Sequence, residues 1–100
     1  MAEGIVYEFT GVTSDHYAAV SRHLGIDPDT GVGAWPPGML FHAAGVADDG
    51  TFIVQEVWSS RADQQAFMDS RLASALAANG VTAAPRVRWV PLVAHYRSDS

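Results

Sequence analysis

The stretch Gly38–Trp58, GMLFHAAGVADDGTFIVQEVW, decides the fold of this chain. Two runs rich in β-forming and small apolar residues, 39–46 and 51–58, flank the turn residues Asp48-Asp49-Gly50. Such runs on either side of a glycine-containing turn are typical of a β-hairpin. We therefore expect two adjacent antiparallel strands here.

The length of the turn determines which polar side chains meet across this hairpin. If Asp49-Gly50 alone forms a two-residue loop, His42 lies opposite Val57. If Asp48-Asp49-Gly50 forms a three-residue loop that ends in a left-handed glycine, His42 lies opposite Glu56. One residue of slip moves every side chain to the other face. We favour the three-residue loop.

Strand alternation then assigns the hairpin residues to two faces. One face is expected to carry Leu40, His42, Phe52, Val54, Glu56 and Trp58. The other is expected to carry Met39, Phe41, Ala43, Ile53, Gln55 and Val57. We expect helices to cover the second face, because it is mostly apolar, and the first face to remain open within a single chain.

Before the hairpin, residues 4–10 (GIVYEFT) predict a strand. A helix follows, capped by Thr13 or Ser14 and ending near Leu24 before Gly25. Its buried stripe is predicted to be Tyr17, Val20 and Leu24, with His16 and His23 at the surface. Residues 26–37 form a long loop, in which Trp35 either pins the loop to the domain or closes a pocket.

After the hairpin, Ser59 or Ser60 is expected to cap a second helix that ends at Asn79-Gly80. Its buried face is predicted to hold Phe67, Met68, Leu72, Ala75 and Leu76, with Arg61, Gln64, Asp69 and Arg71 mostly in solvent. A last strand is predicted from Arg86 to about Tyr96. Because Pro91 cannot donate a ladder hydrogen bond, that strand should lie at a sheet edge or be bulged there.

The predicted element order is strand, helix, strand, strand, helix, strand. Two right-handed crossovers around a hairpin give an α+β, ferredoxin-like βαββαβ domain over residues 1–100, with a four-stranded antiparallel sheet and helices on one face. The open face needs a cover. We expect a homodimer in which two sheets pack against each other.

Composition narrows the function. The net charge is −5 and the six basic residues are scattered, which argues against nucleic acid and against an anionic membrane surface. No apolar run is long enough to predict a membrane span. Cysteine is absent, which excludes disulfides and thiolate chemistry and is consistent with the cytoplasm. With 48% apolar and 17% charged residues, an apolar surface is expected to be covered by a second subunit or a ligand.

The pair His42 and Glu56 is the strongest candidate for chemistry. Across the hairpin, a carboxylate would orient the imidazole and make it a general base near neutral pH. The alternative is a hydrogen bond that only satisfies two half-buried polar groups. The spacing of the four histidines predicts no metal site. The wall of a substrate pocket is predicted to be Trp58, Leu40, Phe52, Val54, Tyr7 and Trp35.

The segment Glu56-Val57-Trp58-Ser59-Ser60, with the acid-bearing helix that follows it, resembles the dimeric α+β barrel superfamily, and most closely its antibiotic-biosynthesis-monooxygenase-like branch. The PPGMLFHAAG segment (36–45) is similar to small uncharacterised members of that superfamily. The resemblance covers the whole chain in element order. It implies a homodimer with a pocket in each subunit, and oxidation of an aromatic substrate by oxygen without metal or flavin. The family's tryptophan at the end of the third strand would be Trp58.

Two departures from the family pattern bear on function. Val54 stands where some of these monooxygenases carry a pocket asparagine, and the second helix has no histidine of the kind that the haem-degrading branch uses. We therefore expect a small cofactor-independent monooxygenase-like or proton-transfer enzyme, an isomerase or cyclase, that acts on a hydrophobic cyclic substrate. His42 would be the base and Glu56 its orienter. The alternative is a ligand-binding or dimeric assembly protein without chemistry.

Overall fold

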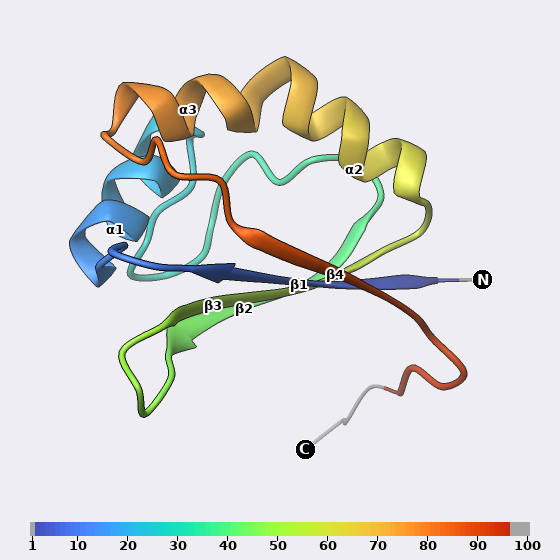
Figure 1. The fold of residues 1–100 in the computed structure, drawn as a ribbon. Coiled ribbons are helices and arrows are strands. Elements are labelled where there is room, and N and C mark those ends of the chain that lie inside the picture. Colours follow the sequence, from blue (N-terminus) through green and yellow to red (C-terminus); the bar gives the residue numbers. More distant parts are fainter. Residues whose placement is uncertain (1, 97–100) are drawn as a thin grey trace.

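The computed structural model describes residues 2–96 and has a sheet with all helices on one side (Figure 1). The elements are β1 Glu3–Phe9, α1 Ser14–His23, β2 Met39–Val46, β3 Phe52–Trp58, α2 Arg61–Phe67, η1 Met68–Leu72, α3 Ala73–Ala78 and β4 Arg86–Pro91. The strand order is β2-β3-β1-β4, and every neighbouring pair is antiparallel. The predicted ferredoxin-like α+β architecture is confirmed.

The turn of the hairpin has the predicted three-residue form. Ala47 N–H donates to Thr51 O at 2.8 Å, and Gly50 N–H donates to Ala47 O at 2.9 Å. Gly50 has φ +89°, a backbone conformation that residues other than glycine rarely adopt. His42 is consequently the cross-strand partner of Glu56.

A β-bulge near the start of β2 changes the predicted alternation. Met39 pairs with Trp58 and Phe41 pairs with Val57, so Leu40 is an extra residue without a partner. A bulge of this kind moves the residues before it to the other face. Met39 therefore joins the face of His42, and the prediction that Leu40 lies on that face is wrong, since its side chain is 54% exposed.

The prediction of which face the helices cover is also wrong. Phe52, Val54 and Trp58 are buried under the helices, while Phe41 on the opposite face is 48% exposed. The reason lies in the central strand β1, whose register aligns its buried residues with this face of β3. The helices cover the face on which large apolar side chains from three strands combine.

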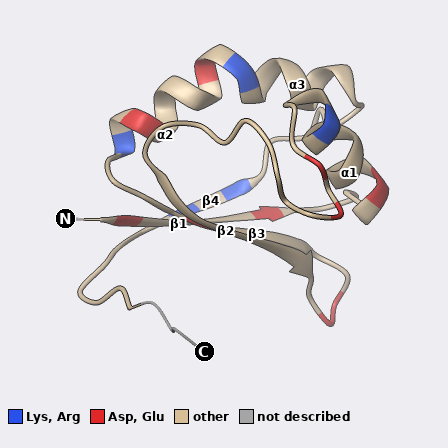
Figure 2. Cartoon of the chain, turned by 180° about the vertical axis from the view of Figure 1, so that it is seen from behind, with Lys and Arg blue, Asp and Glu red and all other residues tan. Residues whose placement is uncertain are grey.

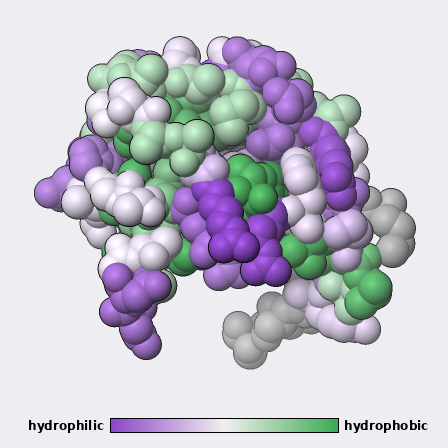
Figure 3. Space-filling model, viewed as in Figure 1, coloured by the Kyte–Doolittle hydropathy of each residue, from purple (hydrophilic) through white to green (hydrophobic). Residues whose placement is uncertain are grey.

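The buried core lies between this sheet face and the helices. Its members are Ile5, Tyr7, Phe9, Val20, Phe52, Val54, Trp58, Phe67, Ala75 and Val81. The opposite face presents charged side chains of β1 and β4 as well as apolar ones. Arg86 and Arg88 are exposed there, and hydrophilic surface gathers over β4 in Figure 3.

Helix α1 begins at the predicted place. Thr13 is its N-cap and forms a capping box with His16, whose Nδ1 accepts the backbone N–H of Thr13 at 3.0 Å. Gly25, with φ +81°, follows the C-terminus. Because its ring is held in this cap, His16 is half-buried rather than a free surface residue, while His23 is exposed as predicted.

The predicted second helix is present as α2, η1 and α3 in one continuous run (Figure 1). Ser60 is the N-cap and accepts the N–H of Asp63 at 3.1 Å. The segment η1 is a π-helical turn, of the kind that often occurs near functional sites. Gln64 was predicted to face solvent, but it is buried, because its amide has a buried hydrogen-bond partner on β1.

The last strand is shorter than predicted. β4 ends at Pro91 instead of continuing to about Tyr96. It pairs only with β1 and forms one edge of the sheet, where a proline is tolerated because no further strand needs its missing N–H.

Candidate functional site

A cavity of about 420 Å³ lies between the covered face of the sheet and the helices. This volume is within the range of small-molecule sites in proteins. Strands β1, β2 and β3 contribute Tyr7, Phe9, Met39, His42, Phe52, Val54 and Glu56 to its wall. The helices and loops contribute Tyr17, Val20, Leu24, Trp35, Phe67, Met68, Leu72, Leu76 and the segment 81–85 among others. The wall is mostly apolar, with a few polar groups grouped around His42.

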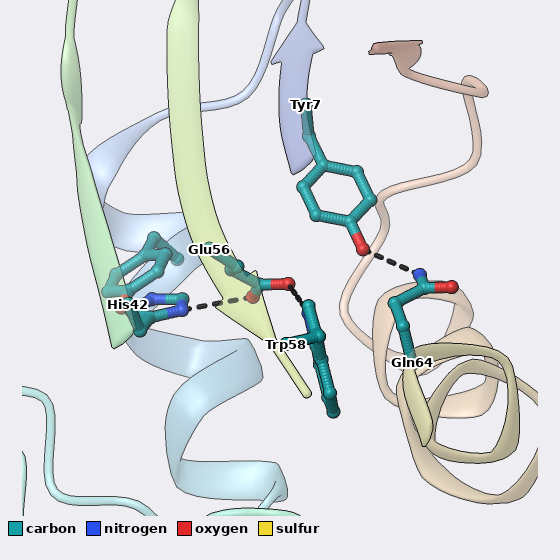
Figure 4. Close-up of polar contacts among 6 residues, drawn as sticks. Tyr7, His42, Glu56, Trp58 and Gln64 are labelled. Atoms are coloured by element: carbon teal, nitrogen blue, oxygen red, sulfur yellow. Dashed lines mark hydrogen bonds and ion pairs between the residues drawn. The ribbon is translucent and has the colours of Figure 1, made fainter. Parts of the chain in front are cut away.

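Glu56 is the centre of these polar groups. His42 Nδ1 lies 3.0 Å from Glu56 Oε2, and Trp58 Nε1–H donates to Glu56 Oε1 at 2.9 Å (Figure 4). The Glu56 carboxylate is 5% exposed and the Trp58 side chain is fully buried, with 0% exposure. Glu56 and Trp58 share a face because they are two residues apart on a strand. Both carboxylate oxygens therefore have partners despite their burial.

Tyr17 on α1 completes a chain of three side chains. Its hydroxyl lies 2.7 Å from His42 Nε2, and its ring stacks on the imidazole at a centroid distance of 5.9 Å. A carboxylate only accepts hydrogen bonds, so Nδ1 of a neutral His42 carries the proton and Nε2 is the acceptor. The tyrosine O–H thus donates to Nε2, and the chain is Tyr17–His42–Glu56.

A second polar pair lies beside this chain. Gln64 Nε2–H donates to the Tyr7 hydroxyl at 2.6 Å (Figure 4). Burial, followed by the negative charge of Glu56, raises the pKa of Tyr7 well above its ordinary value. Burial is also the main cause that raises the pKa of Tyr17, with a smaller contribution from Glu56. Both phenols therefore stay protonated at neutral pH.

The loop between α1 and β2 covers the His42 side of the cavity. The Trp35 ring lies 5.0 Å from the His42 ring, centroid to centroid, and Trp35 Nε1–H donates to Gly31 O at 2.7 Å. The guanidinium of Arg71, on η1, donates to Ala34 O at 3.0 Å and to Leu24 O at 2.6 Å. The helix thus holds the loop in place beside the imidazole.

Six of the eight predicted site residues line the cavity: His42, Glu56, Phe52, Val54, Tyr7 and Trp35. Leu40 does not, because of the bulge. Trp58 does not either, since it is enclosed in the core and reaches the site only through its bond to Glu56. Whether any of these residues is catalytic or binds substrate stays a prediction.

Sequence reasoning missed Tyr17 and Gln64 as polar members of the site. Tyr17 was placed on a buried helical stripe, and a buried tyrosine hydroxyl normally needs a partner. That signal was available, but it did not identify the partner, because the contact joins residues 25 positions apart. Within residues 2–96 no cluster of three histidine or acidic side chains is arranged to hold a metal ion.

Comparisons with known proteins place the fold. No protein-family profile matches the sequence, and no curated protein matches it either. A solved structure described as a "putative Antibiotic biosynthesis monooxygenase" from Chloroflexus aurantiacus J-10-fl is similar, with a TM-score of 0.68, 16% identity, and coverage of 97% of this chain and 98% of that chain. Rv0793 from Mycobacterium tuberculosis is similar with a TM-score of 0.64, 16% identity and 100% coverage of both chains.

A third structure, from Deinococcus radiodurans and with the same description as the first, has a TM-score of 0.55, 12% identity, and coverage of 99% and 98% of the two chains. The chain thus has the same fold as these three solved structures, and two of the three carry the description that the resemblance in its sequence implied. Identities this low establish the fold alone, so the chemistry has to be argued from the site. No helix in the described part of the chain is long and apolar enough to cross a membrane.

Proposed function

We propose that this protein is a small enzyme that removes a proton from a hydrophobic cyclic substrate bound in the cavity. It would act as a proton-transfer enzyme, an isomerase or cyclase, or as a cofactor-independent monooxygenase. The observation that carries the proposal is the position of His42, which lines an apolar cavity while a buried carboxylate holds its Nδ1 at 3.0 Å.

The roles follow from the chemistry of the pair. Glu56 fixes the tautomer in which Nε2 of His42 is the basic nitrogen. When Nε2 takes a proton, the imidazolium that forms lies against the Glu56 carboxylate, which stabilises the positive charge. Phe52 and Val54 would provide apolar contacts for a ring, and Trp35 would limit the access of water to the imidazole. Deprotonation of a phenol or enol in this position is the first step of isomerisation, cyclisation or reaction with dioxygen.

The names of two structural neighbours support the oxidative version. The Chloroflexus and Deinococcus proteins carry a monooxygenase description, and cofactor-free oxidation also starts from a deprotonated substrate. The geometry of the site is equally suited to proton transfer without oxidation, because both reactions require a base beside an apolar wall.

The test is turnover of a panel of polycyclic phenols in air-saturated buffer, followed by product analysis and by oxygen consumption. His42→Ala should abolish turnover, while His95→Ala, which changes an exposed histidine, should not. Oxygen consumption matched to product identifies an oxygenase, and product without oxygen consumption identifies an isomerase or cyclase. Equal activity of His42→Ala and the wild type would end the assignment of the base.

The second candidate is a ligand-binding protein without chemistry. It is favoured by the completeness of the polar network: among residues 2–96, no buried side-chain nitrogen or oxygen lacks a hydrogen-bond partner. Such a network is stable without any substrate. Binding of ring compounds without any turnover by the wild type would support this candidate.

We also propose a homodimer formed through the open face of the sheet. Phe41 and Val90 are 48% and 43% exposed on that face, and the strands there carry few charges near β2 and β3 (Figure 2). Apolar sheet faces of this kind need a cover. Sedimentation should give a dimer at micromolar concentration, and Phe41→Glu should shift it towards monomer without unfolding. A wild-type monomer under these conditions would remove the proposal.

A further inference from the structure

The polar chain Tyr17–His42–Glu56 in the cavity wall ends at the Tyr17 hydroxyl. Glu56 occupies Nδ1 of His42, and the Tyr17 hydroxyl occupies Nε2 at 2.7 Å. Neither nitrogen is available for a ligand while these contacts hold. Tyr17 lines the cavity, so its hydroxyl oxygen, which has further lone pairs, can accept a hydrogen bond from a ligand.

The direction of the hydrogen bonds defines what that oxygen offers. The single proton of Tyr17 points to Nε2, since Nδ1 carries the proton of the imidazole. The lone pairs of the Tyr17 oxygen that remain act only as acceptors. A ligand that contacts this atom must therefore supply a donor, such as a hydroxyl group, and an ether or carbonyl oxygen at the same place would leave the acceptor unpaired.

The negative charge in the cavity wall restricts the class of ligand further. The buried Glu56 carboxylate lies in the cavity wall, where the low dielectric strengthens repulsion of a second anion. The sequence contains no lysine, and no arginine among residues 2–96 lines the cavity. His16 also lines it, but its Nδ1 accepts from the backbone of Thr13 and the ring is held in the helix cap. Apart from its two histidines, whose contacts are described above, the described part of the wall holds no side chain that could neutralise a carboxylate or a phosphate.

We infer that the cavity selects a neutral, hydroxylated ring, a phenol or an enol, whose hydroxyl donates to Tyr17, and that Tyr17 passes this proton to His42. The inference rests on the proposed function, which it deepens by naming the ligand class and a further catalytic residue.

The proton transfer balances without any oxidant or reductant. The O–H bond of the ligand breaks, and its proton forms a new bond to the Tyr17 oxygen. The proton that Tyr17 held moves to Nε2 of His42. The ligand becomes a phenolate or enolate, the imidazole becomes an imidazolium beside Glu56, and the total charge in the cavity is unchanged. The anion thus forms only when a compensating cation has formed with it.

Three ring compounds of similar size test the ligand class by calorimetry near neutral pH. 2-Naphthol is neutral and has a donor, 2-methoxynaphthalene is neutral and has none, and 2-naphthoate is an anion. We expect 2-naphthol to bind about three- to tenfold more tightly than 2-methoxynaphthalene, as one net hydrogen bond implies, and naphthoate to bind most weakly. Equal affinity for naphthol and naphthoate, or no binding of naphthol, would overturn the inference.

Variants test the role of Tyr17. Tyr17→Phe keeps the ring but removes the phenol oxygen, and it also frees Nε2 of His42 as an acceptor. In the double variant Tyr17→Phe/His42→Phe both acceptors are absent, so the preference for 2-naphthol over 2-methoxynaphthalene should disappear while the affinity for the ether is kept. Tyr96→Phe is the matched control, because Tyr96 is 90% exposed, and it should retain the wild-type preference. A double variant that retains the preference would refute the contact.

Glu56→Gln tests separately whether the negative charge of Glu56 disfavours anionic ligands. It should raise the affinity for 2-naphthoate relative to 2-naphthol, since the buried negative charge is gone. The three-ligand comparison on the wild type is decisive if this buried variant does not fold. The expected preference without any turnover would leave the ligand class standing and end the catalytic proposal. Turnover by a protein that shows no such preference would leave the catalytic proposal standing and end the proposed ligand class.

Discussion

Removal of the Glu56 carboxylate should destabilise the fold far more than removal of a surface acid. In Glu56→Ala, the indole N–H of Trp58 loses its acceptor at 2.9 Å in a fully buried position. An orphaned buried donor costs about 1–3 kcal/mol. The N–H of His42 also loses its partner, but that side chain is 17% exposed, so water can compensate for part of the loss.

The total loss of unfolding free energy in Glu56→Ala can be estimated from these contacts. The indole N–H contributes about 2 kcal/mol and the lost methylene about 0.8 kcal/mol. The imidazole adds about 1 kcal/mol, and release of the buried carboxylate offsets part of the total. We expect the free energy of unfolding to fall by about 3 kcal/mol, which corresponds to a decrease in Tm of about 12–24 °C for a domain of this size.

The assay is urea unfolding followed by tryptophan fluorescence, at one fixed protein concentration because a dimer links stability to concentration. Glu8→Ala is the control. Glu8 forms a long contact of 3.7 Å with the exposed Arg86, so its removal should change stability by no more than about 0.5 kcal/mol. If Glu56→Ala and Glu8→Ala lose the same small amount, Glu56 does not hold Trp58 as described.

The remaining predictions concern the turn, the buried phenol and the loop. Gly50→Ala should lower the free energy of unfolding by about 1–2 kcal/mol. The cause is backbone strain alone, since a Cβ at this φ of +89° would meet nothing within 4 Å. Gly45→Ala is the control: its Cβ would be equally unobstructed but Gly45 has no positive φ, so the free energy of unfolding should hardly change in the same denaturant assay. The pKa of Tyr7 is raised in the folded protein, so as pH rises Tyr7 ionises in the unfolded chain first. The contribution of the Tyr7 hydroxyl to stability is therefore fully present below the ordinary phenol pKa of 10.0 and is lost as pH rises above that value. The loss of unfolding free energy from about pH 9 to about pH 11 should therefore be smaller in Tyr7→Phe, and an identical slope would contradict the burial of this hydroxyl. Trp35→Ala should lower Tm little, because the side chain is 38% exposed, yet it should weaken binding of 2-naphthol by calorimetry; undiminished affinity would show that the loop does not cover the bound ligand.

Local chemistry explains why much of the fold could be predicted. The hairpin turn needs a glycine with positive φ, which places the turn at Gly50 and leaves two registers, of which the favoured one has His42 opposite Glu56 and is observed. The caps at Thr13 and Ser60 similarly set where the helices begin. Each of these features depends on residues a few positions apart, so the sequence alone narrowed each to two alternatives, and it predicted the element order and hence the ferredoxin-like topology.

The covered face of the sheet depended on long-range packing. It is set by which side chains of β1 align with β3, and a hairpin considered alone does not contain that information. The bulge that displaces Leu40 and the burial of Gln64 against Tyr7 have the same origin. Packing energy is summed over whole faces, so it can override the local apolar pattern of a single pair of strands.

The candidate site also combines features that depend on local sequence with features that depend on long-range packing. The sequence by itself narrowed the register to two alternatives and favoured the one that pairs His42 with Glu56, and this is the register observed. Only the tertiary structure decided that the pair lies in a cavity beneath the helices, that Trp58 supports Glu56 from the core, and that the Tyr17 hydroxyl bonds to the imidazole. The physical reason is that hydrogen bonds between a helix and a strand depend on how the two elements pack, which no local sequence pattern specifies.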